Sequence, residues 1–370
     1  MHRPNLRGRQ SRRYANYELA EEFIQFVDTD VLPHVELPSY KRAEKQTLLR
    51  HATHNLILTG LPGLVVADGR TSNDERRQPL NFREHIATVA QRGPDGRADP
   101  RAIENGMAYF RAKEDTIESI NRSNLEHGWA AVCTHMDGTT TTFQPNVCLR
   151  QIHVGTFFEA ARLYSFGVLS GQNLSKAVRS TMRIDGERAA EFDFSGMHPR
   201  MLYSRVGHRV EGDPYKPEAV LPGVAPTVEP DGPDLPVRDF LKRCLNACLN
   251  ARGGRGAVHS SISNKLRALP NTRRLLEEEV GGVAGLVDRL LEAHAPIARY
   301  FFTGIGMELM TQDGIVMLTI MRAHRDARKP ALPIHDSVVC RASDAEFTRV
   351  TMAGVYRHLL AHHPVIKRVF

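Results

Sequence analysis

The stretch RAAEFDFSGMHPRMLYSR, residues 188–205, changes from an alternating pattern to a helical one within a few residues. Ala189 to Phe194 alternates and predicts a β-strand, while Ser195 and Pro199 are typical of the N-cap and first turn of a helix. Asp193 then lies at the carboxyl end of a strand, beside a helix start. A carboxylate there either caps the helix or holds a metal ion, and this stretch alone leaves both open.

A second aspartate lies in LPIHDSVVCRA, residues 332–342. Two apolar runs flank His335-Asp336 and predict a tight hairpin, in which an aspartate is ordinary turn chemistry. However, Asp193 and Asp336 are both isolated acids on apolar strands of a plausible common sheet, where two carboxylates repel unless cations lie between them. Mg²⁺ prefers such ligands, and two ions can hold the attacking and leaving oxygens of an in-line displacement. The sequence therefore predicts two Mg²⁺ ions, with Mn²⁺ as a substitute.

The third stretch is VRDFLKRCLNACLN, Val237 to Asn250, which predicts an amphipathic helix. Arg238, Lys242, Asn246 and Asn250 recur every four residues opposite its apolar side. Arg238 and Lys242 are spaced to bind neighbouring phosphates of one triphosphate, and the two amides could meet the sugar or base. A merely solvated face is the alternative interpretation.

Composition sets the broad class. The chain has 370 residues, 41% apolar and 25% charged, which suits two or three compact units. It has neither a run of roughly 18 apolar residues nor a secretory signal at its start, so we expect a cytoplasmic protein without a membrane partner. Five scattered cysteines favour free, mostly buried thiols and a reducing compartment; Cys244 and Cys248 lack the His or Cys neighbours of a zinc site.

The charge points to a polyanionic partner. The formal net charge is +7 and the isoelectric point about 9.3. Met1 to Arg13 holds five arginines and no acid, so this arm either lies on a phosphate backbone or is a solvated tail.

Patterning divides the rest of the chain. Apolar spacing predicts helices at Tyr17 to Leu32, Tyr40 to Leu58, Phe82 to Gln91 and Ile103 to Leu125. Short β-prone runs follow at Trp129 to Thr134, Thr139 to Phe143, Val147 to Val154 and Glu159 to Tyr164. Residues 211–236, rich in Pro, Gly and Asp, are expected to form a long exposed loop or the edge of an insertion; helices then return until about residue 328.

In this order the three stretches resemble motifs A, B and C of the family A DNA polymerases and the related single-subunit phage-type RNA polymerases. DFSGMHPR (193–200) resembles motif A, RDFLKRCLN (238–246) the start of motif B, and IHDSVV (334–339) motif C. RLYSFGVLSGQNLSKAVR (162–179) is similar to the family's primer- and template-contacting segment, and the helix with Leu309, Met310 and Asp313 resembles the one before motif C. The resemblance covers roughly residues 160–360.

The resemblance implies an α+β fold with right-hand polymerase architecture: an antiparallel palm sheet, helical fingers and a reduced, thumb-like helical N-terminal region. The implied domains are a basic arm (1–13), the thumb-like region (14–127), the first part of the palm (128–210), the fingers (211–304) and the second part of the palm (305–370).

It also implies roles for individual residues. Asp193 and Asp336 become catalytic metal ligands, with Phe194 offering its carbonyl. The implied nucleotide-binding residues are Arg238, Lys242, Asn246 and His198. The implied nucleic-acid contacts are Arg162, Gln172, Asn173, Arg200, Asn250 and His335. Primed DNA, or a DNA/RNA template, and dNTP or NTP substrates are the implied partners.

Some positions depart from the family pattern. His198 replaces a glutamate that closes over the sugar, Asn246 replaces an aromatic residue, and Asn250 replaces a tyrosine near the template base. Sugar discrimination and base-pair checking therefore do not carry over. Ser337 is more like the RNA-polymerising members, whereas the Gln-Asn-Leu segment is more like the DNA-polymerising ones. The stretch Gln25 to Val31 resembles the Asp-x-Glu that opens a 3′-5′ exonuclease, but its second acid is Asp30, it has helical periodicity and no clear further carboxylate motifs follow. We therefore expect no active exonuclease, and small size without one suggests a bacterial, phage or plasmid context.

The sequence thus favours a template-directed DNA polymerase that attaches a nucleotide to a primer 3′-hydroxyl. Three alternatives remain: an RNA polymerase or primer-synthesising enzyme on the same palm, a catalytically inactive nucleic-acid-binding module, and an unrelated metal phosphohydrolase.

Overall fold

A computed structural model describes residues 55–58, 100–154, 161–165, 169–224, 227–229 and 231–370. The chain divides into two compact units: unit 1 comprises Met1–Asp193, Gly314–Val355 and Ile366–Phe370, and unit 2 comprises Phe194–Asp313 and Tyr356–Val365. The basic arm, the acidic stretch at 25–31 and most of the expected N-terminal helices lie outside the described residues. The end of the helix expected at 40–58 is wrong, because β1 (Asn55–Leu58) is a strand paired with β4.

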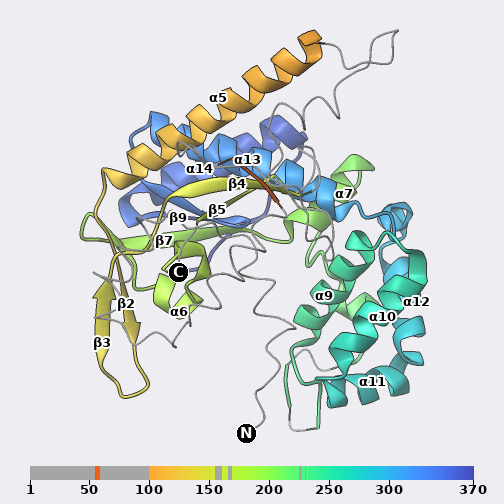
Figure 1. Ribbon diagram of the computed structural model, residues 1–370. Coiled ribbons are helices and arrows are strands. Elements are labelled where there is room, and N and C mark those ends of the chain that lie inside the picture. Colours follow the sequence, from red (N-terminus) through yellow and green to blue (C-terminus); the bar gives the residue numbers. More distant parts are fainter. Residues whose placement is uncertain (1–54, 59–99, 155–160, 166–168, 225–226, 230) are drawn as a thin grey trace, which may run out of the picture. The chain divides into compact units, whose positions relative to one another are not determined.

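Unit 1 is a mixed α+β body with two sheets (Figure 1). A three-stranded sheet has the order β1-β4-β5, and a seven-stranded sheet has the order β3-β2-β6-β7-β9-β8 with β10 also paired to β7. The strands other than β1 are β2 (Trp129–Thr134), β3 (Thr140–Phe143), β4 (Leu149–Val154), β5 (Arg162–Ser165), β6 (Arg183–Ile184), β7 (Glu187–Phe194), β8 (Ala331–Ile334), β9 (Ser337–Arg341) and β10 (Ile366–Arg368). The expected strands and hairpin are therefore present; β5 begins three residues later than its pattern predicts.

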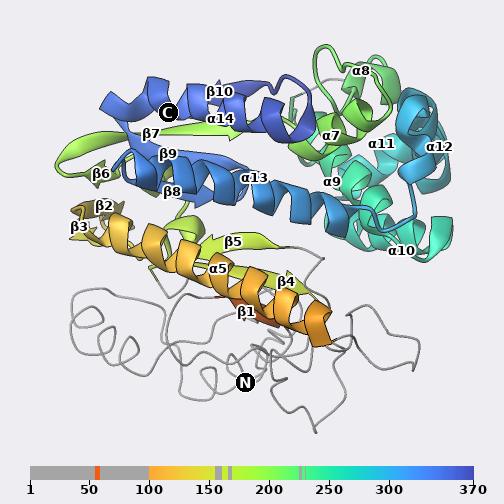
Figure 2. The ribbon, with the colours of Figure 1, turned by 90° about the horizontal axis from the view of Figure 1, so that it is seen from above.

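Helix α5 (Pro100–Leu125) joins the two sheets of unit 1 through two buried asparagines near its C-terminal end. The Asn121 amide donates to the Leu149 carbonyl at 2.8 Å and accepts from the Leu149 N–H at 2.6 Å. Asn124 forms the same two bonds with Ala331, at 2.9 and 3.2 Å. Since Leu149 begins β4 and Ala331 begins β8, each asparagine satisfies the backbone of one strand end. Figure 2 shows α5 running alongside β4.

The central strand β7 carries a buried ion pair. Glu191 is 1% exposed, and Arg179, which ends α6 (Lys176–Arg179), donates to both of its carboxylate oxygens at 2.9 and 3.0 Å. The same guanidinium donates to the Leu174 carbonyl at 2.8 Å. A carboxylate this deeply buried needs its partner, because an uncompensated charge in the interior is costly. The pair therefore holds α6 against β7.

We predict that Arg179→Ala lowers the free energy of unfolding by about 3–5 kcal/mol, because it leaves the Glu191 carboxylate buried without a counter-charge. Urea unfolding followed by circular dichroism measures the change. The double variant Arg179→Ala/Glu191→Gln removes the orphan charge and should recover at least half of the loss. A single variant as stable as the wild type would contradict this assignment.

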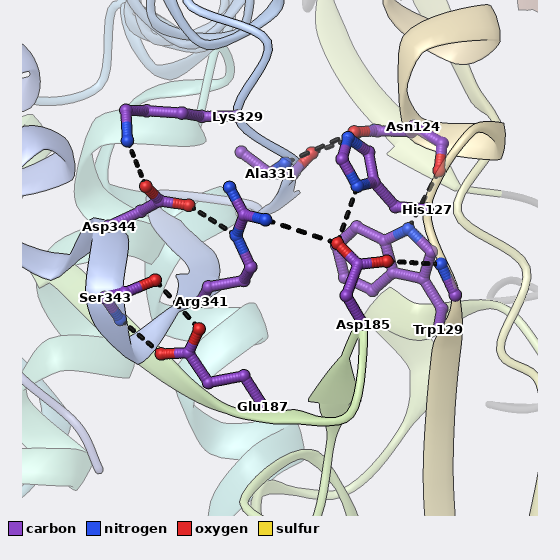
Figure 3. Close-up of polar contacts among 11 residues, drawn as sticks. Asn124, His127, Trp129, Asp185, Glu187, Lys329, Ala331, Arg341, Ser343 and Asp344 are labelled. Atoms are coloured by element: carbon purple, nitrogen blue, oxygen red, sulfur yellow. Dashed lines mark hydrogen bonds and ion pairs between the residues drawn. The ribbon is translucent and has the colours of Figure 1, made fainter.

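A second polar network lies near the N-terminal end of β7 in unit 1 (Figure 3). Asp344, 2% exposed, is held by Lys329 and by the Arg341 Nε at 2.7 Å. Arg341 also reaches Asp185, whose carboxylate bonds His127 Nδ1 at 2.7 Å and accepts the Gly128 N–H at 2.8 Å. Burial alone would raise the pKa of Asp344, but the hydrogen bonds and charges of Lys329 and Arg341 outweigh it and lower that pKa.

The lowered pKa gives a pH-dependent prediction. Ionised Asp344 stabilises the folded chain at pH values above its ordinary pKa of 3.8. This contribution is lost as the pH falls through the lower pKa that Asp344 has in the folded chain. Asp344→Asn should therefore cost about 1–2 kcal/mol at neutral pH. Its difference from the wild type should shrink as urea unfolding is repeated towards about pH 3. Glu346→Gln, in an exposed pair with Arg349, is the control and should change stability little. A pH-independent Asp344→Asn effect would refute the linkage.

Unit 2 is mainly helical. Its elements include α7 (Met197–Arg205), α8 (Pro217–Val220), α9 (Val237–Asn250), α10 (Gly254–Leu266), α11 (Pro270–Val280) and α12 (Val283–Ala293). Figure 1 shows α9 to α12 gathered together, and their core includes Phe240, Leu241, Val258, Ile262, Leu276, Leu286 and Leu290. The long helix α13 (Gly306–Asp326) and the helix α14 (Ala345–Leu360) each have one part in each unit.

Residues 211–236 are not simply an exposed loop. They contain α8, and Pro214, Tyr215, Val220 and Leu221 are buried. The Pro, Gly and Asp content that suggested exposure reflects local turns, whereas long-range packing buries only these positions of the segment. Within the part of the chain that the structure describes, no helix has the length and apolar character needed to cross a membrane.

Candidate active site

The two predicted metal-binding aspartates come together at one end of the paired strands β7 and β9 in unit 1. β7 pairs with β9 in antiparallel register, which places Asp193 directly opposite Ser337. Asp336 precedes Ser337 in the two-residue turn between β8 and β9, where Ile334 pairs with Ser337. The two aspartates are 143 residues apart in sequence. In the sheet, however, Asp336 lies one residue along the chain from Ser337, the residue opposite Asp193 on the neighbouring strand. Both side chains are partly exposed.

Ser337 orients one of these carboxylates. Its buried hydroxyl donates to Asp193 Oδ1 at 2.9 Å. Residues directly opposite in an antiparallel pair share one face of the sheet, so this bond follows from the register. The preceding turn residue, His335, is exposed, adopts a left-handed φ of 56°, and meets the ring of Tyr164 edge-on at 6.1 Å between centroids. Sequence analysis noted Ser337 only as more like the RNA-polymerising members, and Tyr164 only as part of the 162–179 segment.

The residues present fit a magnesium site. Mg²⁺ is usually held by one or two carboxylates, with water and substrate phosphates completing its shell. Asp193 and Asp336 supply two carboxylates, and the Phe194 carbonyl follows Asp193 directly in the chain. In the described ranges, no group of three or more His, Cys, Asp or Glu residues is arranged to hold a metal ion. The ion content stays a prediction.

The predicted primer and template contacts of unit 1 differ in their surroundings. The buried Gln172 amide donates to the Pro333 and Leu163 carbonyls at 2.7 and 3.0 Å and accepts the Ser165 N–H at 3.1 Å. It therefore ties β5 to β8. Asn173 is exposed and Arg162 partly exposed. Nucleic-acid contact by these residues stays a prediction.

In unit 2, the start of α7 differs from expectation. Ser195 was expected to be the N-cap, but Gly196 takes that position with a φ of 61° and no side-chain cap is made. A Cβ at residue 196 would also lie against Pro214. The left-handed backbone and the close approach of Pro214 both require glycine here, which the Ser-based capping rule does not anticipate.

The Arg200 guanidinium is engaged by backbone oxygens. It donates to the carbonyls of Ser195, Val210 and Gly212 at 2.9, 2.7 and 2.8 Å. Burial lowers the pKa of this guanidinium from its ordinary value. Arg200 thus fixes residues 210–216, which we call the 210–216 loop, against α7, and its predicted contact with nucleic acid is untested.

His198, predicted to bind nucleotide, contacts a buried acid. Its Nε2 lies 3.5 Å from Asp313 Oδ2; the His198 side chain is 18% exposed and that of Asp313 is 0% exposed. Asp313 is thus placed to orient the imidazole. Sequence analysis placed Asp313 on a family-like helix without a role.

Helix α9 has the expected two faces. Its buried residues are Val237, Phe240, Leu241, Cys244, Leu245, Cys248 and Leu249. All five cysteines of the chain are free thiols, as expected. Burial raises the pKa of the Cys244 thiol and raises that of Cys248 to about 12, which makes both unreactive packing residues. Lys242 and Asn250 are exposed, while Arg238 and Asn246 are partly exposed. The Asn250 amide donates to the Asn246 carbonyl at 2.7 Å.

The 210–216 loop brings two unforeseen residues to the cationic side of α9. The Asp213 carboxylate pairs with the Arg238 guanidinium. The Tyr215 ring lies 5.0 Å from Arg238 Cζ and 6.0 Å from Lys242 Nζ. The Asp-Pro-Tyr sequence gives only a turn signal, so nothing local shows that it reaches α9, which follows 20 residues later.

The chain was also compared with known proteins. No protein-family model matches the chain, and no curated protein matches it. Among solved structures, it is similar to the POL domain of Pol1 from M. smegmatis in complex with DNA primer-template and dNTP, with a TM-score of 0.36 and 11% identity. The match covers 79% of this chain and 60% of that chain. A similarity of this size carries no functional argument.

The Arg200 contacts generate a prediction for the 210–216 loop. Arg200→Met keeps the aliphatic packing but leaves three carbonyls without their donor, so it should lower the free energy of unfolding by about 1–3 kcal/mol. It should also speed cleavage at Arg209 in limited trypsin digestion. Arg205→Met, which removes a partly exposed pair with Glu308, is the matched control on the same helix. Equal cleavage rates at Arg209 in both variants would contradict the anchoring role.

Proposed function

We propose that this chain is a template-directed DNA polymerase that joins nucleotides to a primer 3′-hydroxyl with the help of two Mg²⁺ ions. The observation that carries the proposal is the β7–β9 register. It places Asp193 opposite Ser337, the residue that directly follows Asp336 in the chain. The order of the three motif-like stretches and the cations of α9 support it. We further propose the right-hand polymerase arrangement for the fold, with primed DNA and dNTP as partners.

In this proposal Asp193, Asp336 and the Phe194 carbonyl would hold the ions; when bound, these would stabilise the charge of the transferring phosphoryl group and make the primer hydroxyl more acidic. Arg238 and Lys242 bind the triphosphate and stabilise the negative charge of the departing pyrophosphate. Ser337 keeps one oxygen of Asp193 occupied, which restricts the rotation of that carboxylate. Asp313 orients His198, which we propose lies near the nucleotide.

Primer extension on a labelled primed template tests the proposal. Asp193→Asn and Asp336→Asn each remove a metal-binding charge with little change of shape, and in Asp193→Asn the new amide oxygen can still accept the Ser337 bond. Several kcal/mol of transition-state stabilisation should be lost, so extension should fall at least about 100-fold, while duplex binding changes less than about threefold. Asp326→Asn, at an exposed pair with Arg325, should extend like the wild type.

The same assay separates the other functions. Wild-type extension by either aspartate variant would remove the proposed site. Preferential rNTP incorporation, or synthesis without a primer, would assign the chain to RNA or primer synthesis, as Ser337 would suit. Salt-dependent DNA binding without any Mg²⁺-dependent product would indicate a binding module, and phosphate release without strand lengthening a phosphohydrolase.

A further inference from the structure

The Arg238 guanidinium already binds an anion of the chain itself. Asp213 pairs with its Nε, and the two side chains are 30% and 38% exposed. The Tyr215 N–H donates to the other carboxylate oxygen, Asp213 Oδ1, at 3.0 Å, so the acid is held from both sides. A carboxylate and a phosphate offer the same oxygen geometry to a guanidinium. Asp213 thus fills a position that suits one phosphate.

Tyr215 shapes the same place from beside the two cations. The residue is 4% exposed, yet its ring is within 5.0 Å of Arg238 Cζ and 6.0 Å of Lys242 Nζ. Such cation–π contacts orient the cations without neutralising them. If Asp213 left, Arg238 and Lys242 would still be presented together on one aromatic ring. The site therefore consists of two cations, one ring and one removable carboxylate.

The fold keeps Asp213 close to Arg238. Arg200 binds the carbonyls of Val210 and Gly212, and Pro214 packs against Gly196. These contacts anchor the 210–216 loop to α7 on both sides of Asp213, whereas the Asp213 side chain itself stays partly exposed. The loop can therefore remain in place while a single side-chain rotation exchanges the partner of Arg238.

We propose that Asp213 is an internal substitute for a phosphate: it occupies Arg238 until a polyphosphate displaces it. The naming of a nucleoside triphosphate as that ligand rests on the proposed function. A carboxylate carries one negative charge and a triphosphate several, so the triphosphate displaces Asp213 from Arg238. Because this contact must first be broken, Asp213 lowers the affinity of the site for the triphosphate. The opposite role, in which Asp213 stays and aligns Arg238 for the ligand, predicts that loss of the carboxylate weakens binding.

Isothermal titration of the full chain with inorganic tripolyphosphate tests the proposal. Asp213→Asn keeps an acceptor for the Tyr215 N–H and removes the competing charge, so it should bind tripolyphosphate about fivefold more tightly than the wild type, the size expected for a partly exposed ion pair. Arg238→Gln should weaken binding in both backgrounds and make Asp213→Asn without further effect. Unchanged or weaker binding by Asp213→Asn would overturn the proposal.

Asp239→Asn is the matched control. Asp239 is on α9 itself and lies 3.9 Å from Arg238 Nη1, outside hydrogen-bond distance, with a side chain 55% exposed. Removing it changes the net charge equally, so it should tighten binding less than about twofold. Equal tightening by both variants would show a general charge effect and overturn the exchange. Tripolyphosphate carries no nucleoside and the assay measures no reaction, so absence of primer extension would refute the proposed function alone.

Discussion

The pairing of β7 with β9 fixes where both aspartates lie. Strand side chains alternate between two faces, so a slip of one residue would move Asp193 to the other face and away from Ser337. Glu191 lies two residues before Asp193 and on the same face, where its bidentate pair with Arg179 resists that slip. The Val369 N–H adds a bond of 2.8 Å to the Glu191 carbonyl. A buried charge thus helps to set the position of the candidate catalytic residue.

The elements with a clear local period were predictable from the sequence. The alternation of Ala189 to Phe194, the two apolar runs around His335-Asp336 and the four-residue spacing of α9 each reappear as strand, hairpin and amphipathic helix. These patterns depend on neighbours within a few residues. The adjacency of Asp193 and Asp336 needed one further assumption, that their strands share a sheet, and the register of β7 and β9 meets it.

What the sequence could not show depends on partners far along the chain. Gly196 replaces Ser195 as N-cap because the backbone turns left-handed beside Pro214, a residue 18 positions later. The 210–216 loop has the composition of an exposed segment, but Arg200 and Pro214 anchor it. Asp313 becomes a partner of His198 only when α13 packs near α7. In each case, the local signal was correct about polarity but contained no information on the partner.

The arginines show why composition is a weak guide to ligands. Arg179 and Arg200 use their donors on a buried carboxylate and on backbone carbonyls, so an excess of arginine is partly a requirement of the fold. Arg238 differs, since its nearest carboxylate, Asp213, is partly exposed, and we propose that another anion replaces it. The two aspartates, in contrast, would supply only part of the ligands that a Mg²⁺ ion needs. An ion held by one or two carboxylates relies on water and substrate phosphates to fill its shell. In the proposed function, a polyphosphate would give Arg238 and Lys242 an anion of higher charge than the Asp213 carboxylate, and phosphate oxygens are also the ligands that a Mg²⁺ ion held by one or two carboxylates would lack.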